Sequence, residues 1–226
     1  FVHINFNENP YGPSEKVLKA IRDGVSVSSR YPDVSYGDLR TDLAKLHGVA
    51  AENIMAGAGS TEILKLCDDM FLGPRPRLVA AEPVYDAVIQ YAVNSRAAVV
   101  KVPLTRDYRH DVAKMADAAT PQTGMIYICN PGNPTGTIVT KDELQRFMDR
   151  VPDSVPVVLD EAYSQFAGPG FESAINYVKQ GRNIVVVKTF SKAYGLAGMR
   201  IGYAIARKTL IDRMRPYGLD FAITTL

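Results

Sequence analysis

The sequence has little cysteine, no long apolar run and no signal for export. Only two of its 226 residues are cysteines, too few for a disulfide framework, and we expect both, Cys67 and Cys129, to be reduced core residues. No apolar segment approaches the roughly 18 residues that would cross a membrane. The start of the chain lacks the pattern of a signal peptide. These absences predict a cytoplasmic protein with no membrane partner.

Histidine is also scarce, and neither sign of charge dominates. The three histidines, His3, His47 and His110, are scattered, and neither an HExxH nor a CxxC motif occurs, so we predict no metal site. Lys and Arg number 26 against 24 Asp and Glu, without a basic run interleaved with aromatic residues, and we expect no nucleic-acid partner. With 46% hydrophobic residues, the chain can build a sizeable core.

Short apolar runs alternate with amphipathic stretches along the chain. This pattern is typical of a mostly parallel sheet covered by helices, so we predict an α/β fold with a mixed, mostly parallel sheet flanked by helices. The expected strands cover residues 78–82, 97–102, 125–129, 155–160, 183–188 and 200–206. Helices are expected over 39–46, over 63–71 after the turn GAGST, and over 140–151, where Thr140 and Glu143 have the spacing of a capping box.

Ligands of open α/β sheets bind beyond the carboxyl ends of the strands, and four strand or turn ends in this chain carry unusual chemistry. The first is the glycine-rich turn in MAGAGSTEILKL, which leads directly into a helix. Free N–H groups there, with the hydroxyls of Ser60 and Thr61, favour a phosphate. A simple helix cap is the alternative. Neither GxGxxG nor a P-loop is present, so no dinucleotide or nucleotide site is indicated.

The second end is VPVVLDEAYSQF, where Asp160 closes a strongly apolar run. We expect this carboxylate at the edge of the core, partly desolvated and in need of a cationic partner. Glu161 would point to the other face of the strand and be structural, while Tyr163 would return a phenol to the side of Asp160. The alternative is that Asp160 only caps the next segment.

The third and fourth ends are MIYICNPGNPTG and the stretch after NIVVVK. Two Asn–Pro steps predict an irregular loop that holds Asn130 and Asn133 beside a ligand. Lys192 and Arg200 lie among small, aromatic and glycine residues, and buried cations without adjacent acids are costly. A lysine that extends to the surface is the ordinary alternative.

Together these ends supply what pyridoxal 5′-phosphate requires of a protein. Lys192 offers an amine for a Schiff base, and Asp160 offers an acid for the pyridinium nitrogen. The glycine-rich turn offers phosphate donors, and amide and phenol groups can bind the ring oxygen. Desolvation and nearby cations should lower the pKa of Lys192 and keep the amine nucleophilic.

The series of a glycine-rich turn, NPTG, DEAY and SKAYGLAGMRIGY resembles the fold-type I aminotransferases of classes I and II over nearly the whole chain. The resemblance implies a three-layer αβα large domain, with Lys192 forming the Schiff base and transferring the substrate proton. It also implies that Asp160 pairs with the ring nitrogen and that Tyr85 stacks on the ring. The residues it implies at the ring oxygen are Asn133 and Tyr163, and those at the phosphate are Gly59, Ser60, Thr61, Ser191 and Arg200.

Two further segments, NFNENPYGPS and RYPD, resemble the histidinol-phosphate aminotransferase branch of that family. This resemblance implies a homodimer in which Tyr31 reaches the phosphate of the neighbouring subunit. It also implies that Asn9 and Tyr11, together with Asn133, border the substrate. The implied reaction moves an amino group from an amino acid, with histidinol phosphate as the candidate donor, to a 2-oxo acid.

The resemblance also predicts the domain organisation. It implies an N-terminal arm with a first helix over residues 1–30 and a cofactor-binding large domain over 31–226. In the family a smaller C-terminal domain follows and provides the arginine that binds the substrate carboxylate. We therefore expect the chain to be cut at both ends.

Other functions stay open at this point. A decarboxylase or a C–S lyase on the same scaffold would use Lys192 equally well, so neither the amino donor nor the bond broken is decided. A non-catalytic regulator that senses pyridoxal phosphate through this domain is a weaker alternative, since it would need a fused DNA-binding module. The weakest is a purely structural α/β module.

Overall fold

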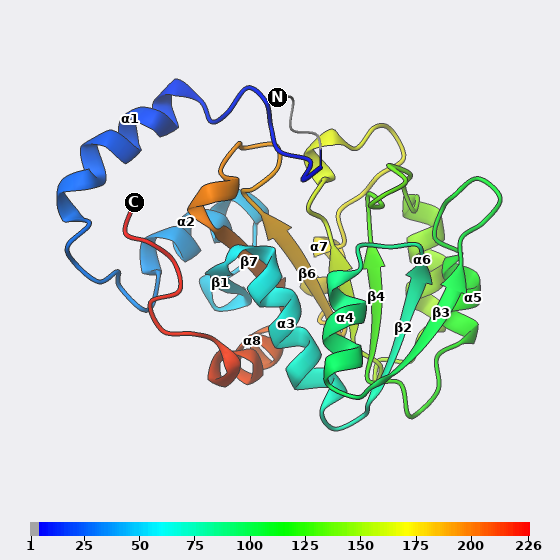
Figure 1. Cartoon of the computed structure of the whole chain (residues 1–226). Coiled ribbons are helices and arrows are strands. Elements are labelled where there is room, and N and C mark those ends of the chain that lie inside the picture. Colours follow the sequence, from blue (N-terminus) through cyan, green and yellow to red (C-terminus); the bar gives the residue numbers. More distant parts are fainter. Residues whose placement is uncertain (1–4) are drawn as a thin grey trace.

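The computed structural model describes residues 5–226, so His3 and the first four residues of the predicted arm lie outside the described residues. Within that part of the chain, seven strands form one sheet in the order β1-β7-β6-β5-β4-β2-β3 (Figure 1). The strands are β1 (Ile54–Ala58), β2 (Arg77–Glu82), β3 (Ala98–Pro103), β4 (Met125–Cys129), β5 (Val157–Asp160), β6 (Ile184–Thr189) and β7 (Ile201–Ala206).

The sheet is mixed and mostly parallel, as the sequence predicts. Strands β3, β2, β4, β5 and β6 pair in parallel, whereas β7 runs antiparallel to both β6 and β1. Because β7 opposes both of its neighbours, β1 points the same way as β6. The carboxyl ends of β1, β2, β4, β5 and β6 therefore meet the amino end of β7 at one edge of the sheet.

The prediction missed strand β1. Its sequence, IMAGA, contains only small residues after Met55, and such a sequence is also typical of a glycine-rich turn. The strand forms because β7 provides its hydrogen-bond partners, with Gly57 opposite Gly202. An added Cβ at Gly57 would lie 2.9 Å from Cδ1 of Ile63, so a larger residue there would require the Ile63 side chain to shift. The small residues thus reflect close packing of helix on strand, and the turn is confined to the junction between β1 and the next helix.

Helices cover both faces of the sheet (Figure 1). Helices α3 and α4 pack together against one face, while α5 and α6 pack together and, with α7, cover the other. The helices are α1 (Glu15–Gly24), α2 (Gly37–His47), α3 (Gly59–Leu72), α4 (Ala87–Asn94), α5 (Val112–Asp117), α6 (Lys141–Arg150), α7 (Ile175–Lys179) and α8 (Lys208–Met214). Short 3-10 helices occupy Val25–Val27, Ala51–Asn53, Ser164–Phe166, Ala197–Met199 and Arg215–Tyr217.

The predicted helix signals are confirmed where they were strongest. At α6 the backbone N–H of Glu143 donates to Oγ1 of Thr140 at 3.4 Å, and Oε2 of Glu143 accepts from the backbone N–H of Thr140 at 2.8 Å. Together these bonds form the predicted capping box. Helix α2 ends at His47 and is capped by Gly48, whose φ of +62° favours glycine.

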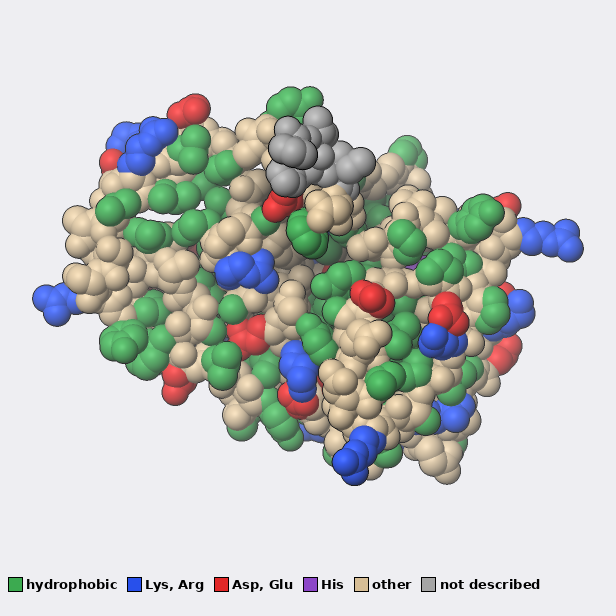
Figure 2. All heavy atoms as spheres, in the orientation of Figure 1, with side chains coloured by type: hydrophobic (Ala, Val, Ile, Leu, Met, Phe, Trp, Pro, Cys, Tyr) green, Lys and Arg blue, Asp and Glu red, His purple; other side chains and the backbone are tan. Residues whose placement is uncertain are grey.

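The core lies between the sheet and its helices, and both cysteines, Cys67 and Cys129, are buried and unpaired there. Helix α1 buries none of its residues and projects from the body (Figure 1). The division into 1–30 and 31–226 stays a prediction. Charges of both signs are interspersed on the face drawn in Figure 2. None of the helices formed by residues 5–226 has the length and apolar character needed to cross a bilayer.

An ion pair is buried at the end of β5, on the face opposite Asp160. Nζ of Lys188 lies 2.7 Å from Oε2 of Glu161, and the two side chains are 6% and 0% exposed. Glu161 also accepts hydrogen bonds from Oγ of Ser173 and the backbone N–H of Ala174, both at 2.7 Å. The structural role predicted for Glu161 is therefore confirmed. The sequence analysis did not identify Lys188, a buried lysine whose charge is paired with Glu161.

Removing one partner of this pair should destabilise the fold. Lys188→Met would leave Glu161 charged and buried without a cation, so we expect the free energy of unfolding to fall by about 3–5 kcal/mol. The double variant Lys188→Met/Glu161→Gln should regain much of this loss. Lys19→Met, which breaks the exposed Lys19–Asp23 pair, is the control and should cost less than about 1 kcal/mol. Urea unfolding measures all three, and equal losses in the single and double variants would contradict the prediction.

Candidate active site

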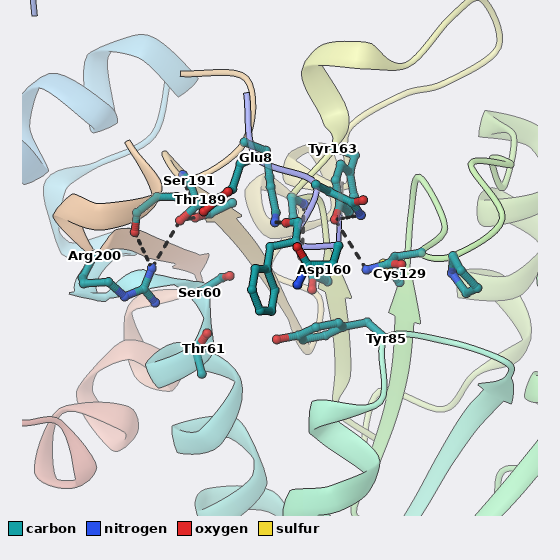
Figure 3. Close-up of a pocket in the computed structure, with 18 residues that line it drawn as sticks. Glu8, Ser60, Thr61, Tyr85, Cys129, Asp160, Tyr163, Thr189, Ser191 and Arg200 are labelled. Carbon is teal, nitrogen blue, oxygen red and sulfur yellow. Dashed lines mark hydrogen bonds between the residues drawn. The ribbon is translucent and has the colours of Figure 1, made fainter. Parts of the chain in front are cut away.

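A cavity of about 510 Å³ opens at the edge where the strand ends meet (Figure 3). Nine of the predicted site residues line it, although they are spread over more than 130 positions of sequence. They are Ser60, Thr61, Tyr85, Asn133, Asp160, Tyr163, Ser191, Lys192 and Arg200. Each lies at or just after the carboxyl end of β1, β2, β4, β5 or β6 or, for Arg200, precedes the antiparallel β7. The sheet topology thus explains why they converge.

Asp160 lies at the floor of the cavity and is 3% exposed. Its Oδ1 accepts from the backbone N–H of Ala162 and its Oδ2 from the phenol of Tyr127, both at 3.0 Å. Burial raises the pKa of Asp160 to about 6, and the two hydrogen bonds oppose that rise. In the described part of the chain no cationic side chain forms an ion pair with this acid. The protein therefore leaves open the position of the cationic partner that the sequence predicts.

Lys192 is half-buried at the mouth of the same cavity. Its Nζ donates to the carbonyl of Phe6 at 2.7 Å and lies 5.8 Å from the ring centre of Tyr163. Burial lowers the pKa of Lys192, and Arg200 lowers it further, whereas the carboxylates of Glu8 and Asp160 act in the opposite direction. The net direction is the one predicted from the sequence. At a given pH, a larger fraction of this amine is therefore neutral and nucleophilic than of a surface lysine.

Tyr163 connects the NPTG loop with the N-terminal arm. Its phenol oxygen accepts from Nδ2 of Asn7 at 3.0 Å and from Nδ2 of Asn133 at 3.4 Å. Burial raises the pKa of Tyr163, so the phenol keeps its proton. With two donors already bound to the oxygen, that proton is free for an acceptor in the cavity.

The opposite end of the cavity is suited to an anion (Figure 3). Ser60 and Thr61 occupy the first turn of the 14-residue helix α3, where backbone N–H groups have no helical partner. Nη1 of Arg200 lies 3.5 Å from Oγ of Ser191, which in turn accepts from Oγ1 of Thr189 at 3.0 Å. These groups provide hydroxyl, N–H and guanidinium donors around one point.

Two glycines allow the groups that form this anion site to lie close together. An added Cβ at Gly59 would lie 2.3 Å from Nη2 of Arg200, and one at Gly202 would lie 2.3 Å from the backbone nitrogen of Ser60. Gly59 therefore makes room for the guanidinium, although it does not itself line the cavity. Arg200 has a φ of +54°, a left-handed conformation that is strained for a non-glycine residue. It is also exposed, so the expectation of a buried cation at this position was wrong.

Four other candidates do not reach the cavity. The prediction for Asn130 was wrong, because its side chain is fully buried and pairs with the backbone N–H and carbonyl of Val139, at 2.9 and 3.0 Å, which braces the loop. Nδ2 of Asn9 donates to the carbonyl of Ala193 at 3.0 Å. Tyr11 is 92% exposed, and Tyr31 is 81% exposed and packs on Phe221.

The structure adds residues that the sequence reasoning missed. Thr189 and Cys129 line the cavity, and residues 5–8 of the arm cross it. Strand register could have indicated Cys129, since it lies opposite Asp160 in the parallel β4–β5 pair. No local signal could have placed the arm, because its contact from Phe6 to Lys192 joins residues 186 positions apart.

Comparisons with known proteins agree with this arrangement. The family model "Aminotransferase class I and II" matches residues 1–226. The chain is 42% identical to a histidinol-phosphate aminotransferase of Moorella thermoacetica and 39% identical to an aromatic amino acid aminotransferase of Streptomyces avermitilis. The alignments cover 100% and 99% of this chain. The crystal structure of a histidinol-phosphate aminotransferase from Sinorhizobium meliloti, in complex with pyridoxal 5′-phosphate, superposes with a TM-score of 0.91 at 28% identity, over 97% of this chain.

The chain spans 58% and 62% of the length of these two sequence relatives and 60% of the solved one. The similarity in sequence and fold therefore applies only to the part of those proteins that this chain covers. Since the family model covers every residue of the chain, the protein belongs to the class I and II aminotransferase family.

Proposed function

We propose that the protein is an aminotransferase that uses pyridoxal 5′-phosphate and Lys192 to move an amino group from an amino acid to a 2-oxo acid. The observation that supports this best is the convergence of Lys192, Asp160 and the anion site on one cavity. The three belong to different strand ends, which the sheet topology brings to one edge. Family membership supports transamination over the decarboxylase, C–S lyase and regulator alternatives, which would use the same residues.

The residues present fit this cofactor. Asp160 is buried, has a raised pKa and lacks a cationic partner within residues 5–226, which suits a protonated ring nitrogen. Tyr163 and Asn133 would bind the ring oxygen, and Tyr85 would stack on the ring. Gly59, Ser60, Thr61, Ser191 and Arg200 would hold the phosphate. When bound, the cofactor provides the electron sink that stabilises negative charge on the substrate α carbon.

The chain's own groups would do the remaining work. Lys192, with its lowered pKa, would move the proton from the substrate α carbon to the cofactor in the first half of the cycle, and in the reverse direction in the second half. Asp160 would keep the ring nitrogen protonated, and Tyr163 would donate its free proton to an oxygen in the cavity. Residues 5–8 of the arm would limit the entry of water.

The substrates are an amino donor and a 2-oxo acid. The similar sequences named above are a histidinol-phosphate and an aromatic amino acid aminotransferase, and both names specify donors with a planar ring. We therefore propose a donor with a planar aromatic or imidazole ring, with histidinol phosphate as the first candidate. Asn9 and Tyr11 stay predictions as substrate contacts, and the cytoplasmic location stays a prediction too.

A homodimer is part of the proposal. Tyr31 is 81% exposed and does not line the cavity of its own chain. A second hollow of about 460 Å³ adjoins the anion site, and Thr61 and Arg200 line both. A side chain from a second copy could reach the phosphate through this hollow, and Tyr31 is the residue we assign to it.

The first prediction concerns Lys192. After reduction with borohydride, the complete protein should bear the cofactor covalently on Lys192, as peptide mass spectrometry would show. In a separate experiment, mixing the unreduced protein with amino donors alone should convert the visible absorbance to that of the pyridoxamine form. Lys192→Ala should lose both the adduct and the conversion, while the surface control Lys208→Ala keeps both. An adduct on another lysine, with conversion intact in Lys192→Ala, would refute the assignment.

The second prediction concerns the effect of Asp160 on the free energy of unfolding. Its folded pKa of about 6 exceeds the ordinary 3.8, so ionisation opposes folding above about pH 4, and the penalty is complete above pH 6. Asp160→Asn should therefore raise the free energy of unfolding of the cofactor-free protein at pH 7.5 by up to about 3 kcal/mol. The gain should disappear below pH 4.

The same variant should lower turnover by about 100-fold or more while weakening cofactor binding much less. Asp107→Asn, on an exposed loop, is the control and should change neither quantity. Thermal or urea unfolding across pH measures the first effect, and steady-state kinetics with a cofactor titration measures the second. Equal losses of turnover and of cofactor affinity would argue against a role at the ring nitrogen.

The third prediction concerns Tyr31. The complete protein should sediment as a dimer, and Tyr31→Phe should keep the dimer but bind pyridoxal phosphate roughly 10-fold more weakly, because a hydrogen bond to a charged group is lost. Tyr108→Phe, at another exposed tyrosine, should bind normally. A monomer with full affinity, or a Tyr31→Phe dimer with unchanged affinity, would contradict the assignment.

A further inference from the structure

Tyr127 stands behind Asp160 and is the largest of the completely buried side chains of the described chain. Its phenol donates a hydrogen bond to Oδ2 of Asp160 at 3.0 Å, from outside the cavity lining. We propose that Tyr127 is a positioning residue that holds Asp160 ionised and directs its carboxylate toward the ring nitrogen of the cofactor. The inference rests on the proposed function, because only a cofactor of that type gives the carboxylate a partner in the cavity.

Strand register places the phenol beside the acid. Cys129 lies opposite Asp160 in the parallel β4–β5 pair, and Tyr127 lies opposite Val158. Side chains alternate along a strand, so Tyr127 and Cys129 share a face of β4, and the phenol of Tyr127 extends along that face to Asp160. The backbone N–H of Ala162 binds the other oxygen at 3.0 Å. The carboxylate is thus held at both oxygens, each with a lone pair still available for a ligand.

Few other groups can stabilise the charge of Asp160. The titratable groups around it are Tyr127 and Cys129 on β4, Glu161 next in the chain, and Tyr85, Tyr163 and Lys192 around the cavity. Of these side chains only Tyr127 forms a hydrogen bond to Asp160, while Lys192 acts through its charge and Glu161 opposes ionisation. Losing the phenol would therefore leave one protein donor on a buried carboxylate.

Tyr127 can only act as a donor in this place. Burial and the adjacent carboxylate raise the pKa of Tyr127 far above its ordinary value, so the phenol stays protonated. A hydrogen bond donated to the charged form of an acid favours that form. This bond therefore stabilises the ionised acid. A role toward the cofactor predicts in addition that losing the phenol weakens ligands with a ring nitrogen more than ligands without one.

The first test uses the cofactor-free complete protein. With aspartate labelled at the carboxyl carbon, NMR titration should give an Asp160 signal, identified by its absence in Asp160→Asn. Tyr127→Phe should raise the pKa of that signal by roughly 1 to 2. Tyr177→Phe is the matched control, since Tyr177 is also buried and donates to Oε1 of Gln145 at 3.1 Å, on the α6–α7 side of the sheet. An unchanged titration in Tyr127→Phe would overturn the proposal.

The second test compares pyridoxal phosphate with 1-deazapyridoxal phosphate, which has carbon in place of the ring nitrogen. The wild type should prefer the first, and Tyr127→Phe should bind it about 10-fold more weakly while binding the deaza analogue as before. Equal weakening for both ligands would mean that Tyr127 only packs the core, and would overturn the proposal. A wild type that does not distinguish the ligands would instead overturn the role of Asp160 in the proposed function, and the NMR test would still decide the role of Tyr127.

A measurement on the wild type keeps the proposal testable if Tyr127→Phe does not fold. With tyrosine labelled at Cζ, the Tyr127 signal should shift with pH at the midpoint of the Asp160 titration, and this shift should be absent in Asp160→Asn. A Tyr127 signal that does not follow this titration would show that the phenol is not coupled to the acid, and the proposal would fail.

Discussion

The site depends on the parallel hydrogen bonding of β2, β4, β5 and β6. Parallel pairing sends every strand the same way, so each connection must return across a face of the sheet, and the strand ends accumulate at one edge. The exception, β7, contributes its amino end to that edge. Groups from six strands therefore surround one cavity, and no single segment could form the site alone.

The junction after β5 separates the carboxylate of the candidate site from a structural one. Asp160 and Glu161 are consecutive, so they point to opposite faces of the sheet end. Glu161 is neutralised by Lys188 and two further donors and anchors the turn beneath the cavity. Asp160 has hydrogen bonds but forms no ion pair within residues 5–226, and burial raises its pKa to about 6. One strand end thus combines a satisfied ion pair with an acid that is energetically costly until a cation binds, which is characteristic of functional sites.

The arm adds a constraint of a different kind. The carbonyl of Phe6 accepts from Lys192, and the amide of Asn7 donates to Tyr163, so residues at the start of the chain contact two groups that the proposed chemistry uses. These contacts hold the arm across the cavity although the arm itself buries little apolar surface. The polar groups of the site therefore organise the segment that covers them.

The sequence alone determined the strands other than β1, the strongest helices and half of the residues that line the cavity, because apolar periodicity and the polar residues that follow each run are local signals. It could not reveal β1, whose small residues make sense only against β7 and α3, nor that Asn130 turns away to brace Val139. The pairing of Lys188 with Glu161 and of Tyr127 with Asp160 was likewise decided by tertiary structure. Each of these depends on which strands become neighbours and in which register, and that is set by the packing of the whole sheet rather than by any one segment.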